Sequence, residues 1–280
     1  MTLIPQRRKA MAELCYNTMN WSPYLVAEGA PSLPAQITAA SAAGFRWFGA
    51  DEGSIGRYCD LGGSVEELAA LILAANMRTY ELPTLMLGAQ REQNRASTER
   101  LAALADQLQP EFVQLNMDSL VDTSVIEDLQ YAGEVFGKLG VRLAIEYLPW
   151  LPEVRNINAT RDVLKRAGVA GAGVLVDCWH FTHSDDTCAD LEALPLDEVA
   201  YVQFNDHPAL IGDDLLMETI TRRAMPGAGE FELDRFASIF RKKGYGGVVS
   251  CEVISLEAQT MDVDSYARAV YQSSKTYWPD

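Results

Sequence analysis

Short apolar segments alternate with amphipathic segments eight times along the 280-residue chain. The apolar segments have the character of β-strands and cover residues 13–17, 45–50, 78–82, 112–117, 141–147, 173–177, 199–205 and 248–253. The amphipathic segments have the character of helices and cover residues 32–43, 65–76, 92–108, 124–139, 158–168, 186–194, 233–243 and 263–274. Strict alternation of strand and helix predicts a parallel sheet with right-handed crossovers.

The number of units decides which parallel architecture we expect. Eight units in 280 residues match an α/β fold of the (β/α)8 TIM-barrel type. An open, doubly wound sheet is the alternative, but no Gly-x-Gly-x-x-Gly pattern follows the first strand, which counts against a dinucleotide-binding fold. No linker or low-complexity tract divides the chain, so residues 1–280 are predicted to form one domain.

Cap residues mark the ends of several expected helices. Gly44 follows the first helix and suits the left-handed conformation that ends many helices. Ser64 and Glu67 have the spacing of a capping box, and Asn158 is expected to cap the helix that ends near Gly168. The glycine-rich stretch between the second strand and Ser64 is expected to be an irregular loop.

The charge and cysteine content exclude several classes of partner. The formal net charge of −16 repels phosphate backbones and anionic lipids, so neither nucleic acid nor a membrane is an expected partner. No apolar run approaches the roughly 20 residues that span a bilayer, and the basic residues near the N-terminus lack the apolar segment of a signal peptide. The five cysteines include no Cys-x-x-Cys pair, which favours reduced thiols in a cytoplasmic protein.

Polar side chains interrupt the last four expected strands near their carboxyl ends: Glu146, Asp177, Gln203 and Glu252. In a barrel these ends meet at one mouth, where active sites lie. Three buried carboxylates would repel one another, and a divalent cation would remove that repulsion. We therefore expect these four side chains to bind one divalent metal ion. Their oxygen atoms favour Mn²⁺ or Mg²⁺, with Zn²⁺ and Co²⁺ as alternatives.

His207 competes with Gln203 for the third ligand position. Residues 201, 203 and 205 share one face of the expected strand, and Gln203 lies deeper in it than His207, so Gln203 is preferred. Each polar residue also has a structural alternative, because a single carboxylate at a strand end can cap a helix or pair with an arginine.

Further residues near the strand ends are candidates for catalysis or substrate binding. His180 follows Asp177 by three residues and is a candidate for both roles. Arg223 precedes two glycines in the connection after the seventh strand and is expected to hold an anionic or carbonyl group of a substrate. Trp179, Tyr147 and His207 are expected to line the substrate pocket. Ordinary loop packing is the alternative for each of them.

Five pieces of the sequence together resemble the xylose-isomerase-like TIM-barrel superfamily of sugar isomerases, epimerases and dehydratases: residues 144–146, 176–180, 202–206, 225–231 and 250–252. The resemblance implies a metal held by Glu, Asp, His and Glu, which fall on Glu146, Asp177, Gln203 and Glu252. Gln203 replaces the usual histidine, which implies a harder ligand set and favours Mg²⁺ or Mn²⁺. A glutamine there is similar to the 3-dehydroshikimate dehydratase branch, which also has an Arg-x-x-Pro-Gly-x-Gly loop like residues 223–229.

The expected chemistry is removal of a proton beside a metal-bound carbonyl of a small polyhydroxylated, sugar-like substrate. Glu146 and Glu252 are the first candidates for the base and His180 is the next. Isomerisation or epimerisation is the main reading, and dehydration of a cyclic hydroxy-keto acid such as 3-dehydroshikimate is the alternative. A barrel that binds a ligand without turnover is a further alternative. A homodimer or homotetramer is the expected assembly. The three-zinc endonucleases of the superfamily are a poor match, because this acidic chain has only three histidines.

Overall fold

Eight parallel strands close into a barrel in the computed structural model, which describes residues 11–26 and 28–279. Each strand pairs with the next along the chain, and the last strand pairs with the first. The strands are β1 (Glu13–Asn17), β2 (Trp47–Gly49), β3 (Arg78–Leu87), β4 (Phe112–Met117), β5 (Arg142–Glu146), β6 (Gly173–Asp177), β7 (Val199–Gln203) and β8 (Val248–Cys251). Closure confirms the predicted TIM barrel and excludes the open sheet.

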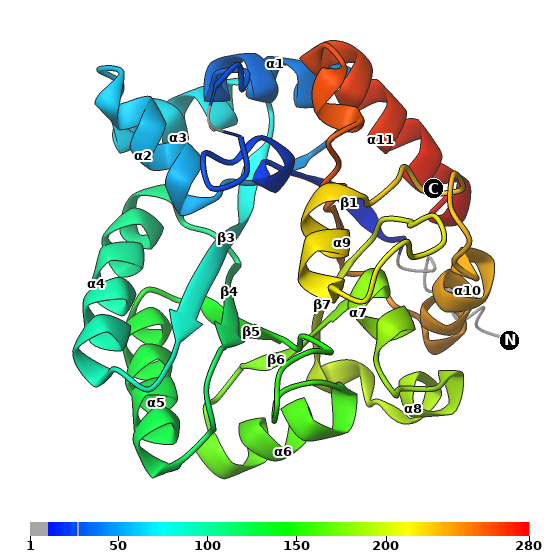
Figure 1. Cartoon of the computed structure of the whole chain (residues 1–280). Coiled ribbons are helices and arrows are strands. Elements are labelled where there is room, and N and C mark those ends of the chain that lie inside the picture. The colour runs from blue at the N-terminus through cyan, green and yellow to red at the C-terminus, as the bar shows by residue number, and fades with distance from the viewer. Residues whose placement is uncertain (1–10, 27, 280) are drawn as a thin grey trace, which may run out of the picture.

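Helices surround the strands as an outer ring (Figure 1). The described α-helices are α1 (Leu33–Ala43), α2 (Glu52–Asp60), α3 (Val65–Ala74), α4 (Arg91–Leu108), α5 (Thr123–Lys138), α6 (Ile157–Ala167), α7 (Cys178–His183), α8 (Cys188–Ala193), α9 (Leu215–Thr221), α10 (Leu233–Lys243) and α11 (Val263–Tyr277). The last helix, α11, packs beside α1 and so completes the ring. Short 3₁₀ turns are η1 (Met19–Trp21), η2 (Leu196–Glu198) and η3 (Ala258–Thr260).

Three of the predicted helix ends, including Gly168 at the end of α6, are confirmed and one is wrong. Gly44 ends α1 with φ of 113°, and Ser64 opens α3 in a capping box. The cap of α6 is Asn156, not Asn158: its side chain accepts a hydrogen bond from Ala159 N over 2.8 Å. Asn156 has the extended backbone that a cap requires, whereas Asn158 already lies inside the helix.

Three helices occupy segments that were predicted to be connections. The expected loop before Ser64 contains α2, which begins after Asp51 and buries Ile55. The carboxylate of Asp51 accepts from Ser54 N over 2.9 Å, so a cap residue begins this helix despite its glycines. The other two, α7 and α9, follow β6 and β7 and lie near the middle of the face seen in Figure 1.

All five cysteines are free, and Cys15, Cys178 and Cys251 are buried. This agrees with the expectation of reduced thiols. Among residues 11–26 and 28–279, no helix has both the length and the apolar character that crossing a bilayer requires.

Candidate metal centre and active site

The four predicted ligands meet at the carboxyl ends of the last four strands. Asp177 lies opposite Gln203 in the register of β6 and β7, Glu146 ends β5, and Glu252 directly follows β8. All four side chains are buried. Gln203 Nε2 donates to Glu252 Oε1 over 3.3 Å. The closed barrel therefore gathers residues that lie more than one hundred positions apart in the sequence.

Arg223 lies between two of these carboxylates. It follows α9 and is only 3% exposed. Its Nη1 lies 2.7 Å from Asp177 Oδ2 and 2.9 Å from Glu252 Oε2. The other two nitrogen atoms face Thr219 and, at 3.5 Å, His180 Nε2. The guanidinium is thus already engaged by the protein, and its expected role in holding a substrate stays a prediction.

Amide side chains orient Glu146 and Glu252 differently. Glu146 Oε2 accepts from Gln114 Nε2 at 2.7 Å and from Asn116 Nδ2 at 2.9 Å, while Glu146 Oε1 has no hydrogen-bond partner. Glu252 Oε1 accepts from Asn17 Nδ2 at 3.4 Å as well as from Gln203, and its Oε2 accepts from Arg223. Glu146 therefore offers a free oxygen and Glu252 does not.

Gln114 and Asn116 were not among the predicted site residues. They occupy alternate positions in β4, so both side chains point to the same face of the strand. The rule that found Glu146, a polar residue interrupting an apolar strand, would also have found this pair.

His180 lies beside the free oxygen of Glu146. Its Nε2 is 3.5 Å from Glu146 Oε1 and 3.8 Å from Asp177 Oδ2. One ligand atom from each of these three residues lies within 4.8 Å of the other two. His180 is therefore a candidate metal ligand as well as the candidate base that the sequence indicated.

Two of the predicted aromatic pocket residues pack in the interior. Trp179 is buried, with its ring centroid 5.2 Å from that of His180 and 6.2 Å from that of Trp150. Tyr147 is also buried, and its hydroxyl has no hydrogen-bond partner. Trp179 holds the orientation of His180, and contact of either aromatic residue with a substrate stays a prediction.

His207 lies away from the strand register that contains Gln203. β7 ends at Gln203, and His207 Nε2 lies 3.2 Å from Glu218 Oε2 on α9. Glu218 also accepts from Ile211 N and Gly212 N at 3.0 Å each. This buried glutamate, which the sequence interpretation missed, anchors α9 to its preceding loop and lies beside the His207 ring.

Burial and charge act differently on the two acids that contact Arg223. Burial raises the pKa of Glu252 well above its ordinary value, and neighbouring Glu146 and Asp177 add to this effect against the opposing influence of Arg223. Burial also opposes ionisation of Asp177, but Arg223 and His180 outweigh it, so the pKa of Asp177 is lowered. One arginine therefore does not offset the burial and the neighbouring carboxylates that disfavour ionisation of Glu252.

The donor set fits a divalent cation. Glu146 Oε1 and Gln203 Oε1 are buried oxygen atoms without hydrogen-bond partners, which is uncommon in a folded interior. When Glu146, Asp177 and Glu252 are all ionised, as metal ligands must be, Arg223 neutralises one of the three negative charges and a divalent ion would neutralise the other two. Carboxylate and amide oxygens suit Mg²⁺ or Mn²⁺, and inclusion of His180 would extend the choice to Zn²⁺ or Co²⁺.

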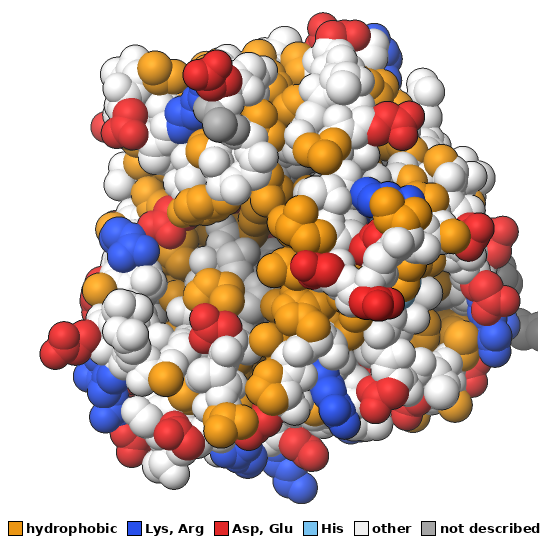
Figure 2. All heavy atoms as spheres, in the orientation of Figure 1, with side chains coloured by type: hydrophobic (Ala, Val, Ile, Leu, Met, Phe, Trp, Pro, Cys, Tyr) orange, Lys and Arg blue, Asp and Glu red, His pale blue; other side chains and the backbone are white. Residues whose placement is uncertain are grey.

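The face that carries α7 and α9 is apolar toward its middle. Figure 2 shows hydrophobic side chains gathered around a hollow there, while most charged side chains lie toward the rim. A cavity of about 500 Å³ on the Arg223 side is lined by residues 221–225 and 255–258 together with Pro208, Ala228 and Met261. Its volume is within the range of small-molecule sites.

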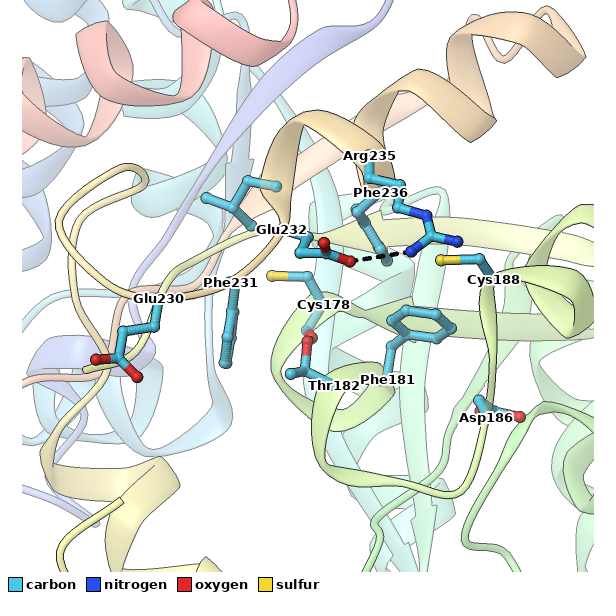
Figure 3. Close-up of a pocket in the computed structure, with 11 residues that line it drawn as sticks. Cys178, Phe181, Thr182, Asp186, Cys188, Glu230, Phe231, Glu232, Arg235 and Phe236 are labelled. Atoms are coloured by element: carbon cyan, nitrogen blue, oxygen red, sulfur yellow. Dashed lines mark hydrogen bonds and ion pairs between the residues drawn. The ribbon is translucent and has the colours of Figure 1, made fainter. Parts of the chain in front are cut away.

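A second cavity, of about 260 Å³, lies between α7, α8 and the start of α10 (Figure 3). Phe181, Phe231 and Phe236 form apolar walls, and Glu232 pairs with Arg235 at the edge. Its lining includes Cys178 but none of the four predicted metal ligands. This cavity is therefore separate from the acid cluster.

A closed parallel barrel with an acidic cluster at the carboxyl ends of its strands defines a class of TIM-barrel proteins with an enclosed polar site. Residues 37–270 match the family model described as xylose isomerase-like TIM barrel, and the chain belongs to this family. The resemblance inferred from the sequence is confirmed.

Named relatives of the chain are enzymes. It is 27% identical over 263 residues to a 3-dehydroshikimate dehydratase of Pseudomonas aeruginosa, covering 88% of this chain and 40% of that protein. It is 26% identical over 145 residues to an inosose isomerase of Halalkalibacterium halodurans, covering 50% of this chain and 49% of that protein. The matches thus cover less than half the length of each of these relatives.

The fold is also similar to that of solved structures. The IolI protein with a bound zinc atom superposes with a TM-score of 0.82 at 15% identity, over 95% of this chain and 97% of that one. At this identity the likeness concerns the fold alone.

Proposed function

We propose that this chain is a divalent-metal-dependent enzyme that removes a proton from the carbon beside a carbonyl group of a small polyhydroxylated substrate. One observation carries the proposal: three buried carboxylates and the free oxygen of Gln203 lie together at the carboxyl ends of the last four strands, where Arg223 pairs with only two of the carboxylates. Glu146, Asp177, Gln203 and Glu252 would hold the ion, with His180 as a competing ligand. A divalent cation bound there supplies Lewis-acid polarisation of a carbonyl oxygen.

The side chains around the site are assigned to proton transfer or to positioning. Glu252 has both oxygens occupied by hydrogen bonds, so Glu146 and His180 are the better candidates to move the proton. If Glu146 Oε1 binds the ion, His180 is the group left to accept the proton, 3.5 Å away. Trp179 fixes the imidazole ring, and Arg223 keeps Asp177 and Glu252 in place.

The named relatives support a carbocyclic substrate. Dehydroshikimate and inosose are both six-membered carbocyclic ketones with neighbouring hydroxyl groups. We propose a substrate of this class. Dehydration is favoured by the dehydratase match, which extends over 88% of the chain. Isomerisation or epimerisation is the second candidate and is supported by the inosose isomerase match over 50% of the chain.

The test is a substrate panel with controlled metal content. Purified chain, stripped with a chelator and reloaded with Mn²⁺, Mg²⁺, Co²⁺ or Zn²⁺, would be incubated with 3-dehydroshikimate, an inosose and ketohexoses. We expect metal-dependent conversion of a carbocyclic ketone, with loss of water marking the dehydratase and an isomeric product marking the isomerase. Conversion that survives chelation, or no conversion and no metal binding, would contradict the proposal.

The two roles open to His180 can be separated in the same assay. His180→Asn should retain Mn²⁺ affinity and lose turnover if the imidazole moves the proton. The same variant should lose Mn²⁺ affinity if the imidazole is a ligand.

A further inference from the structure

Another buried carboxylate, outside the proposed ligand set, lies beneath the proposed metal centre. Glu81 is on β3 and is fully buried. Its Oε1 accepts from Asn17 Nδ2 at 3.0 Å and also from Ser250 Oγ, while its Oε2 has no partner. Gly49 lies opposite it in the register of β2 and β3, where a Cβ would come within 2.6 Å of Glu81 Oε1. The absence of a side chain at Gly49 therefore leaves space in the barrel interior for the Glu81 carboxylate.

Asn17 connects Glu81 to the metal centre. Its Oδ1 accepts from Met19 N over 2.8 Å, which fixes which end of the amide is the donor. Its Nδ2 then has two hydrogens for three acceptors, which lie 3.0 Å away at Glu81 Oε1, 3.3 Å away at Ser250 Oγ and 3.4 Å away at Glu252 Oε1. One amide thus contacts the lower carboxylate and the proposed ligand at the same time.

Glu252 depends on such donors for its orientation. Gln203 is the second donor to the same oxygen, and Arg223 occupies the other one. Of these, Gln203 is itself a proposed ligand, whereas Asn17 is not. Hydrogen bonds to ligating carboxylates from outside the ligand set commonly set ligand direction and metal affinity.

We propose that Asn17 and Glu81 act as a pair of positioning residues for Glu252, with Glu81 anchoring the Asn17 amide so that its second hydrogen is directed toward Glu252 Oε1 and Ser250 Oγ. This inference rests on the proposed metal site. It assigns Glu81 a role as a hydrogen-bond acceptor, in contrast to a role as an additional negative charge that attracts the cation.

Three variants separate these two roles. Asn17→Ala keeps the charge of Glu81 and removes the connection. Glu81→Leu removes both the charge and the acceptor, while Glu81→Gln removes the charge and keeps an acceptor oxygen. The Mn²⁺ dissociation constant, measured by titration calorimetry and by the electron paramagnetic resonance signal of bound Mn²⁺, is the primary readout, and kcat and KM are measured where turnover is found.

We expect Asn17→Ala and Glu81→Leu each to weaken Mn²⁺ binding about 10- to 100-fold, as is usual for residues that orient ligands. Glu81→Gln should recover most of the affinity that Glu81→Leu loses. The double variant Asn17→Ala/Glu81→Leu should be no weaker than either single variant, because both act through one connection. Asn94→Ala, which removes a buried amide bonded to Gly88 and Asp128, is the control for general destabilisation.

Other outcomes identify which idea fails. If Glu81→Gln binds Mn²⁺ as weakly as Glu81→Leu while Asn17→Ala binds normally, Glu81 acts by charge and the inference is overturned. If Glu81→Leu does not fold, normal Mn²⁺ binding by Asn17→Ala still overturns it. If the wild-type chain binds no divalent metal, the proposed metal centre itself fails, and the positioning inference fails with it.

Discussion

Arg223 reaches from the segment after α9 to place its Nη1 2.7 Å from Oδ2 of Asp177 at the end of β6. The same nitrogen contacts Glu252, so the Arg223 guanidinium already bridges two of the three carboxylates. The positive charge of Arg223 therefore offsets part of the repulsion within the acidic cluster. A divalent ion would complete the neutralisation of this cluster rather than supply all of it.

Replacement of Arg223 should make the fold depend more strongly on metal. Arg223→Met leaves Asp177 and Glu252 without their buried cation, and breaking such a pair costs about 3–5 kcal/mol. We expect lower stability in chelator and a larger stabilisation by Mn²⁺ than in the wild type. Urea denaturation with and without Mn²⁺ measures both effects.

Arg222→Met is the matched control, since Arg222 pairs with Glu218 outside the acid cluster. Its stabilisation by Mn²⁺ should equal that of the wild type. Equal Mn²⁺ effects in the Arg223 and Arg222 variants would show that the cation does not bind near Arg223.

Replacement of Glu146 tests whether its free oxygen takes part in metal binding and turnover. Glu146→Gln keeps the shape of the side chain but replaces a carboxylate that is paired with Gln114 and Asn116. We expect weaker Mn²⁺ binding and a loss of kcat of about 10²- to 10⁴-fold, the usual contribution of a positioned base. Glu134→Gln, on the exposed face of α5, should change neither. Normal turnover by Glu146→Gln would remove this residue from the mechanism.

Much of the site could be predicted from the sequence because a barrel converts strand ends into neighbours. Glu146, Asp177 and Glu252 each interrupt an apolar run, and the closed topology then brings them to one mouth. The partners of Arg223 were not predictable, because they depend on how α9 folds back over the strands. The sequence places Arg223 in a glycine-rich connection but does not reveal its burial.

The local sequence also gave a wrong helix cap where two residues of the same type were suitable for the position. Asn156 and Asn158 are both suitable caps, and only the backbone conformation decides between them. Glu81 was overlooked because the search covered only the last four strands; in the expected strand of residues 78–82 it stands one residue before the end, as Glu146 does in residues 141–147.

The ionisation of Glu81 should make stability depend on pH. Burial raises the pKa of Glu81 above its ordinary value, although hydrogen bonds from Ser250 and Asn17 oppose the shift. A carboxyl with a raised folded pKa contributes its full stability below the unfolded value of about 4.3 and loses it as pH rises through the folded pKa. Glutamine does not ionise, so Glu81→Gln should become more stable than the wild type as pH increases.

Urea denaturation from about pH 4 to about pH 9 measures this difference. The free-energy gap between Glu81→Gln and the wild type should widen with pH and narrow toward the acidic end. Glu134→Gln should show no such trend, because Glu134 is exposed. A gap that is constant across the pH range would mean that Glu81 does not change its charge there.

The contact between Gly49 and Glu81 gives a steric test of the same connection. In Gly49→Ala the new Cβ would lie 2.6 Å from Oε1 and 2.7 Å from Cγ of Glu81, so the glutamate must shift. Overpacking of this kind costs about 1–3 kcal/mol, and the shift should also loosen the Asn17 amide and weaken Mn²⁺ binding. Gly56→Ala in α2 is the control, because its Cβ would meet nothing within 4 Å and alanine favours the helix. Gly49→Ala that loses stability but binds Mn²⁺ normally would show that the position of Glu81 does not influence the metal centre.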